Sequence, residues 1–196
     1  MIKIVFLIII VIFFAINMGA SGIAPSFAAV YGGRLIKKKN SLILFGVFVI
    51  LGAVLLGKNV TLTLGKGILP KELMSFDAVL IILGSSALSL FLANILKIPQ
   101  STSQVTVMAV VGVGLYFQRL NLSALFMKIL PAWIILPFLS YILTFLLYRT
   151  IYPPGHNNLH IYEKIFANEK KMKLSALVVS CYVAFAIGTN NVANAV

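Results

Sequence analysis

The sequence predicts an all-α polytopic membrane protein, from its composition, its apolar runs and an internal repeat. Of the 196 residues, 61% are hydrophobic and 10% are charged, whereas a soluble domain has about 45–50% and about 25%. The net charge of +12 arises from 16 basic and 4 acidic residues, and the basic residues cluster in short polar breaks between apolar runs. We therefore expect the lipid bilayer as the surroundings of this chain and no nucleic-acid partner.

The apolar runs predict about six transmembrane or re-entrant helical passages. They cover residues 2–17 with a continuation at 24–31, then 41–57, 78–96, 105–117, 129–148 and 174–187. The first run is too long for one straight crossing and is interrupted by small and polar residues at 17–22. We expect the helix to break there, against protein or a water-filled cavity. The fourth run is short and follows the polar stretch 99–104, which favours a re-entrant hairpin.

The distribution of Lys and Arg predicts a multi-pass protein of the cell membrane with its N-terminus outside. In that orientation ten basic residues lie in inside loops and six lie outside. The inside residues are Arg34, Lys37, Lys38, Lys39, Lys97, Arg149, Lys164, Lys170, Lys171 and Lys173. The start of the chain also resembles a secretory signal, but the same segment recurs later in the sequence, which favours a retained helix.

An internal repeat determines the predicted domain organisation. Residues 15–25 align without gaps on residues 184–194, an offset of 169 residues, and each copy ends an apolar run in small and polar residues. Five predicted crossings separate the copies, so they enter the bilayer in opposite directions, as in inverted-repeat secondary transporters with broken helices. We expect residues 1–173 to form the first transmembrane repeat, with a cytoplasmic loop at about 149–173, and residues 174–196 to begin a second, truncated repeat. The chain would then be a fragment, a truncated gene product or half of a split transporter.

Three polar patches form the candidate substrate site. Half-helix N-termini offer unpaired N–H groups to an anion, and small residues let the backbone approach it. In the polar stretch 99–104, Ser101 is predicted to cap a helix, with Gln104 three residues later, and a run of hydroxyls suits an oxyanion. The predicted binding residues are Ser21 and Gly22 from the first copy, Ser101, Thr102 and Ser103 from the polar stretch, and Asn190, Asn191 and Asn194 from the second copy. The alternative for each patch is structural: helix packing through small residues, or only a helix cap.

The four acidic residues lie outside the interior of the apolar runs. They are Glu72, Asp77, Glu163 and Glu169. Proton relays and cation sites within membranes usually contain a carboxylate. We therefore expect a site that is neutral in its side chains and suited to an anion, with no metal or other cofactor, and the coupling ion is left open as H⁺ or Na⁺.

A different class of function, an intramembrane serine protease, is suggested by one motif. Residues 19–22 read Gly-Ala-Ser-Gly, which resembles the nucleophile motif of rhomboid proteases. That chemistry needs a histidine base within hydrogen-bond reach of the serine. His156 and His160 both lie in the polar stretch 152–173, so we do not expect an enzyme.

Together the repeat copies and the Ser/Thr patch resemble the inorganic phosphate transporter family. Residues 188–194 read Gly-Thr-Asn-Asn-Val-Ala-Asn and match the duplicated family signature Gly-Ala-Asn-Asp-Val-Ala-Asn at five of seven positions. Residues 98–107 read Ile-Pro-Gln-Ser-Thr-Ser-Gln-Val-Thr-Val, which is most similar to the sulfate permease branch of that family. The resemblance implies secondary active transport of an inorganic oxyanion.

The departures from the family signature bear on the substrate. Gly22 and Asn191 stand where phosphate members carry Asp. Hydrogen phosphate has a proton that a carboxylate can accept, whereas sulfate has none and would be repelled. The resemblance therefore implies sulfate as substrate, with phosphate as the alternative, and proton rather than sodium coupling. A second half-transporter or a homo-oligomer would be the protein partner, and a non-transporting half-transporter remnant is a remote alternative.

Overall fold

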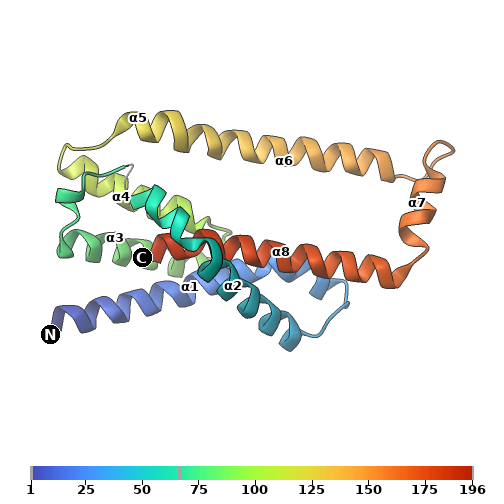
Figure 1. Cartoon of the computed structure of the whole chain (residues 1–196), viewed down its shortest axis with the longest axis horizontal. Helices are drawn as coiled ribbons and strands as arrows, with labels where there is room; N and C mark the ends of the chain where they lie inside the picture. Colours follow the sequence, from blue (N-terminus) through green and yellow to red (C-terminus); the bar gives the residue numbers. More distant parts are fainter. Residues whose placement is uncertain (1, 66–67, 196) are drawn as a thin grey trace. The chain divides into compact units, whose positions relative to one another are not determined.

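The structure is a computed structural model that describes residues 2–65 and 68–195, with the side chains of 59–65, 71 and 192–195 left out of the description. The described residues form helices and connecting loops and contain no strand. The helices are α1 (Ile2–Gly32), α2 (Lys38–Gly65), the 3₁₀ turn η1 (Lys71–Leu73), α3 (Phe76–Leu96), α4 (Thr102–Tyr116), α5 (Leu122–Ala124), the π-helical turn η2 (Leu125–Ile129), α6 (Leu130–Ile151), α7 (Leu159–Phe166) and α8 (Glu169–Ala195) (Figure 1).

Five of the described helical segments are long and apolar enough to cross a membrane. They are Ile2–Gly32, Lys38–Lys58, Phe76–Leu96, Leu122–Ile151 and Glu169–Asn191. Helix α4 is apolar but shorter. The predicted all-α polytopic fold is therefore confirmed. Several helices extend beyond the predicted runs: α8 begins at Glu169 rather than 174, and the segment predicted to begin at 129 is helical from Leu122. Helix α7 forms within the stretch predicted as a loop.

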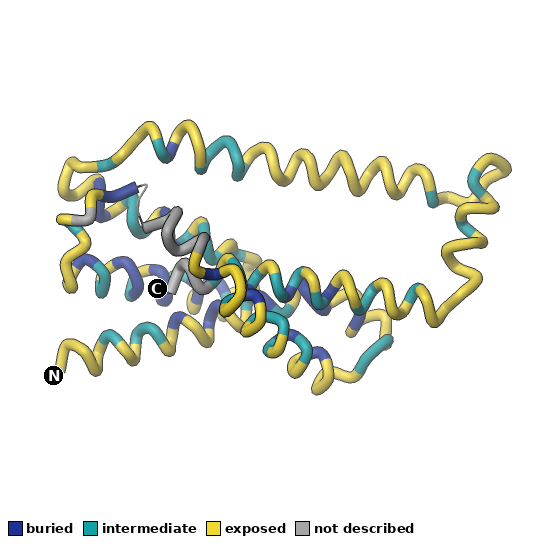
Figure 2. Tube along the Cα trace, in the orientation of Figure 1, coloured by how far each residue is buried: buried dark blue, intermediate teal, exposed yellow. Residues whose placement is uncertain are grey.

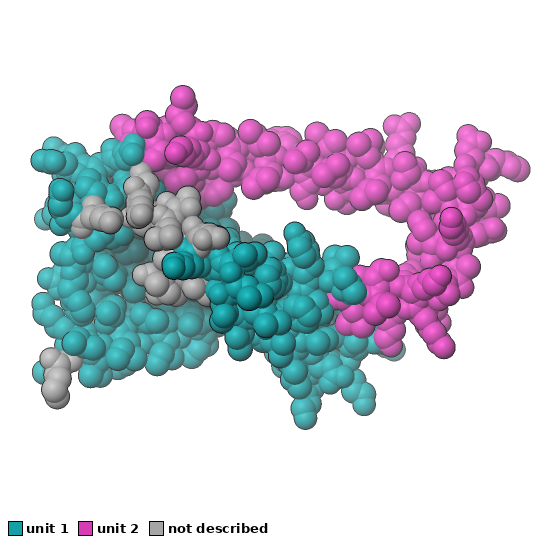
Figure 3. Space-filling view, in the orientation of Figure 1, with its two compact units in different colours: residues 1–121, 178–196 teal, residues 122–177 magenta. Residues whose placement is uncertain are grey.

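The chain folds into two compact units. Unit 1 contains Met1–Asn121 and Val178–Val196, and unit 2 contains Leu122–Leu177 (Figure 3). In unit 2, residues Leu122–Ile151 form one long helical segment, and no residue of its most apolar stretch is buried. The π-helical turn in this segment ends two residues before Pro131, which has no N–H to donate to the preceding turn.

In unit 1, α1 and α3 run in the same direction. Near their starts, Lys3 Nζ lies 3.2 Å from Asp77 Oδ1. Farther along, Asn94 Nδ2 donates to the backbone and side-chain oxygens of Asn17, both at 3.1 Å. These helices share a buried apolar cluster that includes Phe14 and Leu90, and Figure 2 shows buried residues in dark blue along both helices. Within a membrane, close van der Waals packing of such side chains holds the helices together.

Helices α1 and α8 pass through both repeat copies without a break, so the prediction of broken helices at these motifs is wrong. The reason is that the polar side chains bond to carbonyls of their own helix. Ser21 Oγ donates to Met18 O at 2.9 Å, Ser26 Oγ to Gly22 O at 3.0 Å, and Thr189 Oγ1 to Phe185 O at 3.1 Å. Satisfied in this way, small and polar residues are compatible with a continuous helix.

Helices α3 and α4 form a hairpin that brings the Ser/Thr patch to the middle of the unit. Helix α3 ends at Leu96 and is capped by Lys97, which has a left-handed backbone (φ 57°) and donates its N–H to Ala93 O and Asn94 O. Ser101 then caps α4, because its side chain accepts a hydrogen bond from Gln104 N. The predicted N-cap is thus confirmed. The tip of the hairpin lies beside the interior of α1, not its end, since Asn94 bonds to Asn17, and this supports the expected re-entrant geometry.

Candidate functional site

A polar cleft of about 370 Å³ lies between α1, the start of α4 and α8, within unit 1. Its lining residues are Ser21, Gly22, Pro25, Gln100, Ser101, Thr102, Ser103, Tyr182, Val183, Ala186, Ile187, Asn190 and Asn191. Seven of the eight predicted binding residues are therefore brought together, although they come from sequence positions up to 170 apart. The eighth, Asn194, has a side chain that lies outside the described residues. Their role in binding stays a prediction.

Two hydrogen bonds connect the start of α4 to α8 across this cleft. Thr102 Oγ1 donates to Asn191 Oδ1 at 2.8 Å. One residue later in α4 and one residue earlier in α8, Asn190 Nδ2 donates to Ser103 Oγ, also at 2.8 Å. The Ser/Thr patch and the second repeat copy, separate predictions from the sequence, thus form one bonded network.

The hydroxyls of Ser21 and Ser101 are oriented differently. Ser21 donates its proton to Met18 O at 2.9 Å within α1, so what it can offer a ligand is an acceptor. Ser101 accepts from Gln104 N at 3.4 Å, and its own proton has no acceptor among the described residues. Because the unprotonated oxygens of an oxyanion only accept hydrogen bonds, Ser101 is the better placed of the two serines to bind them.

None of the described residues that line the cleft has a charged side chain. The start of α4 nevertheless contributes positive potential, because the first turn of a helix has N–H groups without partners in the helix and the positive end of the helix dipole. Backbone N–H groups, hydroxyls and amides in a low-dielectric setting are suited to a small anion. The geometry therefore accommodates an inorganic oxyanion without a counter-charge from a side chain.

Gly22 of the first repeat copy and Gly188 of the second have different surroundings. Gly22 is buried, and a Cβ there would lie 3.1 Å from the Phe45 ring and 3.3 Å from Ile187. Gly188 does not line the cleft; a Cβ there would lie 2.7 Å from Val49 Cα, in the backbone of α2. The structural alternative of helix packing through small residues is thus correct for Gly188.

The prediction missed several lining residues. Gln100 lines the cleft but was not among the predicted binding residues, although it directly precedes Ser101. Its Nε2 donates a hydrogen bond to Ser89 Oγ at 3.0 Å. The lining residues of α8 form two rows at spacings of four, 182/186/190 and 183/187/191. Since residues four apart share a helix face, this periodicity, counted back from the two asparagines, could have identified them.

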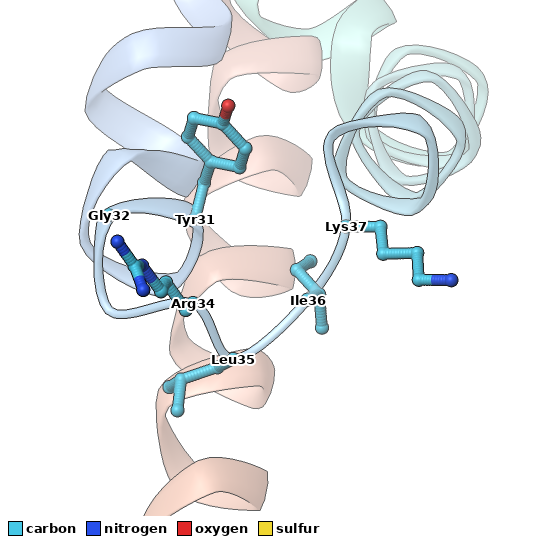
Figure 4. Close-up of a pocket in the computed structure, with 6 residues that line it drawn as sticks. All are labelled: Tyr31, Gly32, Arg34, Leu35, Ile36 and Lys37. Atoms are coloured by element: carbon cyan, nitrogen blue, oxygen red, sulfur yellow. The ribbon is translucent and has the colours of Figure 1, made fainter.

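A second cavity of unit 1, at the turn between α1 and α2, does not form a comparable site. It is lined by Tyr31, Gly32, Arg34, Leu35, Ile36 and Lys37. In Figure 4 the side chains of Arg34 and Lys37 point to opposite sides of the turn. Their charges therefore do not converge on one ligand, and the turn instead contributes a basic surface at one end of α1.

The fold and the cleft define a polytopic helical membrane protein with a neutral, hydrogen-bonding cleft between two repeat copies. The chain belongs to the phosphate transporter family, whose sequence pattern matches residues 18–167.

Curated relatives of the chain include permeases of two kinds. It is 41% identical over 186 residues to the sulfate permease CysP of Bacillus subtilis, covering 94% of this chain and 51% of that protein. It is 29% identical over 178 residues to a putative phosphate permease of Methanocaldococcus jannaschii, covering 89% and 52%. A chloroplastic inorganic phosphate transporter of Arabidopsis thaliana is 29% identical over 149 residues, covering 71% and 25%. The chain spans about half the length of the first two relatives. No solved structure matches it.

Proposed function

We propose that this chain binds an inorganic oxyanion, with sulfate as the preferred substrate, as part of a secondary active transporter. The observation that supports this most directly is the cleft, which joins both repeat copies and the start of α4 and has hydroxyl and amide groups but no carboxylate in its lining. Paired repeat elements around a central site are typical of secondary transporters. The name of the Bacillus subtilis relative, a sulfate permease, agrees with this substrate.

Phosphate is the second candidate, because other relatives are named as phosphate permeases. The residues at 22 and 191 favour sulfate. Gly22 and Asn191 both line the cleft, and neither side chain has the negative charge with which a carboxylate would attract the proton of hydrogen phosphate and repel sulfate. The protease alternative has no support in the cleft, since no histidine is among its lining residues and Ser21 donates to a backbone carbonyl.

Direct binding tests the proposal. The purified chain, in detergent or nanodiscs, should bind ³⁵S-sulfate, and unlabelled sulfate should displace it at lower concentration than phosphate at every pH from 6 to 8. Ser101→Asp should keep the helix cap but lose sulfate binding by charge repulsion, while Ser101→Thr should keep both. Displacement by phosphate at lower concentration than by sulfate would leave only the broader family assignment. Absence of binding to either anion would refute the proposed function.

Transport itself requires uptake measurements, and the coupling ion belongs to this proposal. Proteoliposomes that contain the chain, alone or with a second half-transporter, should accumulate ³⁵S-sulfate when an ion gradient is imposed. The resemblance to sulfate permeases implies an H⁺ gradient, and a Na⁺ gradient is the comparison. Uptake driven by Na⁺ alone would overturn proton coupling without affecting the anion site.

We also propose an inverted repeat with the N-terminus outside. In Figure 1 the part of α8 in unit 1 runs opposite to α1, which supports this arrangement. In a Cys181→Ala background, Asn40→Cys and Asn157→Cys should resist an impermeant thiol reagent in intact cells, whereas Arg119→Cys should react. Asn157 is exposed, and its neighbour Asn158 is avoided because its Oδ1 accepts from Gly155 N. Labelling of the first two positions with protection of the third would reverse the topology.

A further inference from the structure

The orientation of one amide decides which anions the cleft can hold. An asparagine side chain has a donor end, Nδ2, and an acceptor end, Oδ1. If Oδ1 faces a bound oxyanion, it is repelled unless the anion has a proton to donate. If Nδ2 faces the anion, it donates a hydrogen bond to any oxygen without a proton. The group that holds Asn191 in one of these orientations therefore contributes to selectivity.

Thr102 is the group that holds Asn191. Its Oγ1 donates to Asn191 Oδ1 at 2.8 Å. A threonine in the interior of a helix can donate to a carbonyl one turn back, as Thr106 does to Thr102 O at 3.0 Å. Thr102 is the first residue of α4 and has no preceding helical turn to accept its proton. Asn191 Oδ1 takes that place, so the proton of Thr102 fixes which end of the amide faces α4.

The donor end of Asn191 is left for a ligand. Asn191 lines the cleft and is half-buried, and its Nδ2 has no hydrogen-bond partner within the described part of the chain. The neighbouring amide is oriented too, because Asn190 Nδ2 donates to Ser103 Oγ at 2.8 Å. With no carboxylate in the lining, the cleft has no strong acceptor for a substrate proton.

We propose that Thr102 is a positioning residue that, by holding Asn191 Oδ1, makes the cleft select oxyanions without a proton. This inference rests on the proposed function. It states that the cleft distinguishes anions by whether one of their oxygens is protonated, rather than by their charge or their central atom. Sulfate meets this requirement. Hydrogen phosphate has the same shape and at pH 8 the same double charge. One of its oxygens, however, has a proton, and in this cleft that proton would face hydrogen-bond donors instead of an acceptor.

Three divalent anions at pH 8 separate these properties. Sulfate and monofluorophosphate have no proton, whereas hydrogen phosphate has one. Monofluorophosphate and hydrogen phosphate both have a phosphorus centre. Monofluorophosphate should displace ³⁵S-sulfate from the unmodified chain at least 10-fold more effectively than hydrogen phosphate does. Equal displacement by the two phosphorus anions would overturn the inference, because the cleft would then not distinguish a protonated oxygen.

Substitutions at Thr102 test its part. Thr102→Val keeps the shape but removes the hydroxyl, so Asn191 can turn its Oδ1 toward the anion. The preference for monofluorophosphate over hydrogen phosphate should then fall about 3- to 10-fold, which corresponds to one hydrogen bond. Thr102→Ser restores the donor and should restore the preference. Thr106→Val makes the same change one turn farther along α4, outside the cleft lining, and should leave the preference unaltered.

The outcomes distinguish the inference from the function on which it rests. If the unmodified chain does not bind sulfate, the proposed function fails. If it binds sulfate but Thr102→Val retains the full preference, or Thr106→Val loses it equally, only the role of Thr102 is overturned. If Thr102→Val does not fold, Thr102→Ala removes the same hydroxyl and takes its place, and retention of the full preference by Thr102→Ala would overturn the role of Thr102.

Discussion

Replacing Asn191 with aspartate should reduce sulfate binding by more than 100-fold. The new carboxylate would lie in the lining of the cleft, a few Å from a divalent anion. At an effective dielectric of about 20, two unit charges 4 Å apart interact by about 4 kcal/mol, and a 100-fold loss requires only about 2.7 kcal/mol. The change keeps the size of the side chain, and an Asp oxygen can still accept from Thr102 Oγ1, so the fold should be retained.

Phosphate should suffer less from the same substitution. Its protonated oxygen can donate to the new carboxylate, so Asn191→Asp should shift the preference toward phosphate, measured by competition between ³⁵S-sulfate and ³²P-phosphate. Asn40→Asp is the matched control, because it adds the same charge at an exposed position outside the cleft and should leave both affinities unchanged. Equal losses for the two anions in Asn191→Asp would contradict the argument that the missing carboxylates determine the substrate.

The sequence predicted the fold through properties that act locally. Apolar length identified the spans, and the N-cap at Ser101 could be predicted because one side chain and the backbone three residues later suffice to form it. The residues of the cleft could also be predicted, since the repeat copies and the Ser/Thr patch are polar in an apolar setting and must face protein or water. What the sequence did not reveal is how they pair. The Thr102–Asn191 bond depends on how the α3–α4 hairpin places α4 beside α8.

Two errors have a common physical origin. The helices were expected to break at small and polar residues, yet the side chains of Ser21 and Thr189 bond to their own helix and keep it continuous. Small residues of the repeat copies were expected to allow the backbone to approach an anion, but Gly188 allows α2 to approach α8. In both cases the sequence correctly indicates a residue that allows an unusual backbone arrangement or a close approach. Which group makes that approach depends on the tertiary structure, which the sequence alone does not reveal.

Gly188→Ala should destabilise unit 1 by about 3 kcal/mol and greatly reduce sulfate binding. A Cβ at Gly188 would lie 2.7 Å from Val49 Cα, and on the facing helix a Cβ at Gly52 would lie 2.9 Å from the Phe185 carbonyl carbon. These are backbone atoms that cannot rotate away, so the helices must separate, at the upper end of the roughly 1–3 kcal/mol typical of overpacking. Separation would also break the bond from Thr189 Oγ1 to Gly52 O, 3.3 Å long.

The loss of binding follows from the position of Gly188 in the sequence. Asn190 and Asn191 lie two and three residues farther along α8, so a shift of this helix away from α2 changes their distances to Ser103 and Thr102, now 2.8 Å each. Gly46→Ala is the matched control on α2, because nothing lies within 4 Å of a Cβ there, and removing a helical glycine should stabilise by up to about 1 kcal/mol. Thermal unfolding in detergent, followed by circular dichroism at a helical wavelength, compares the two variants. If Gly188→Ala unfolds at the temperature of Gly46→Ala, the close approach of α2 and α8 does not hold the cleft together.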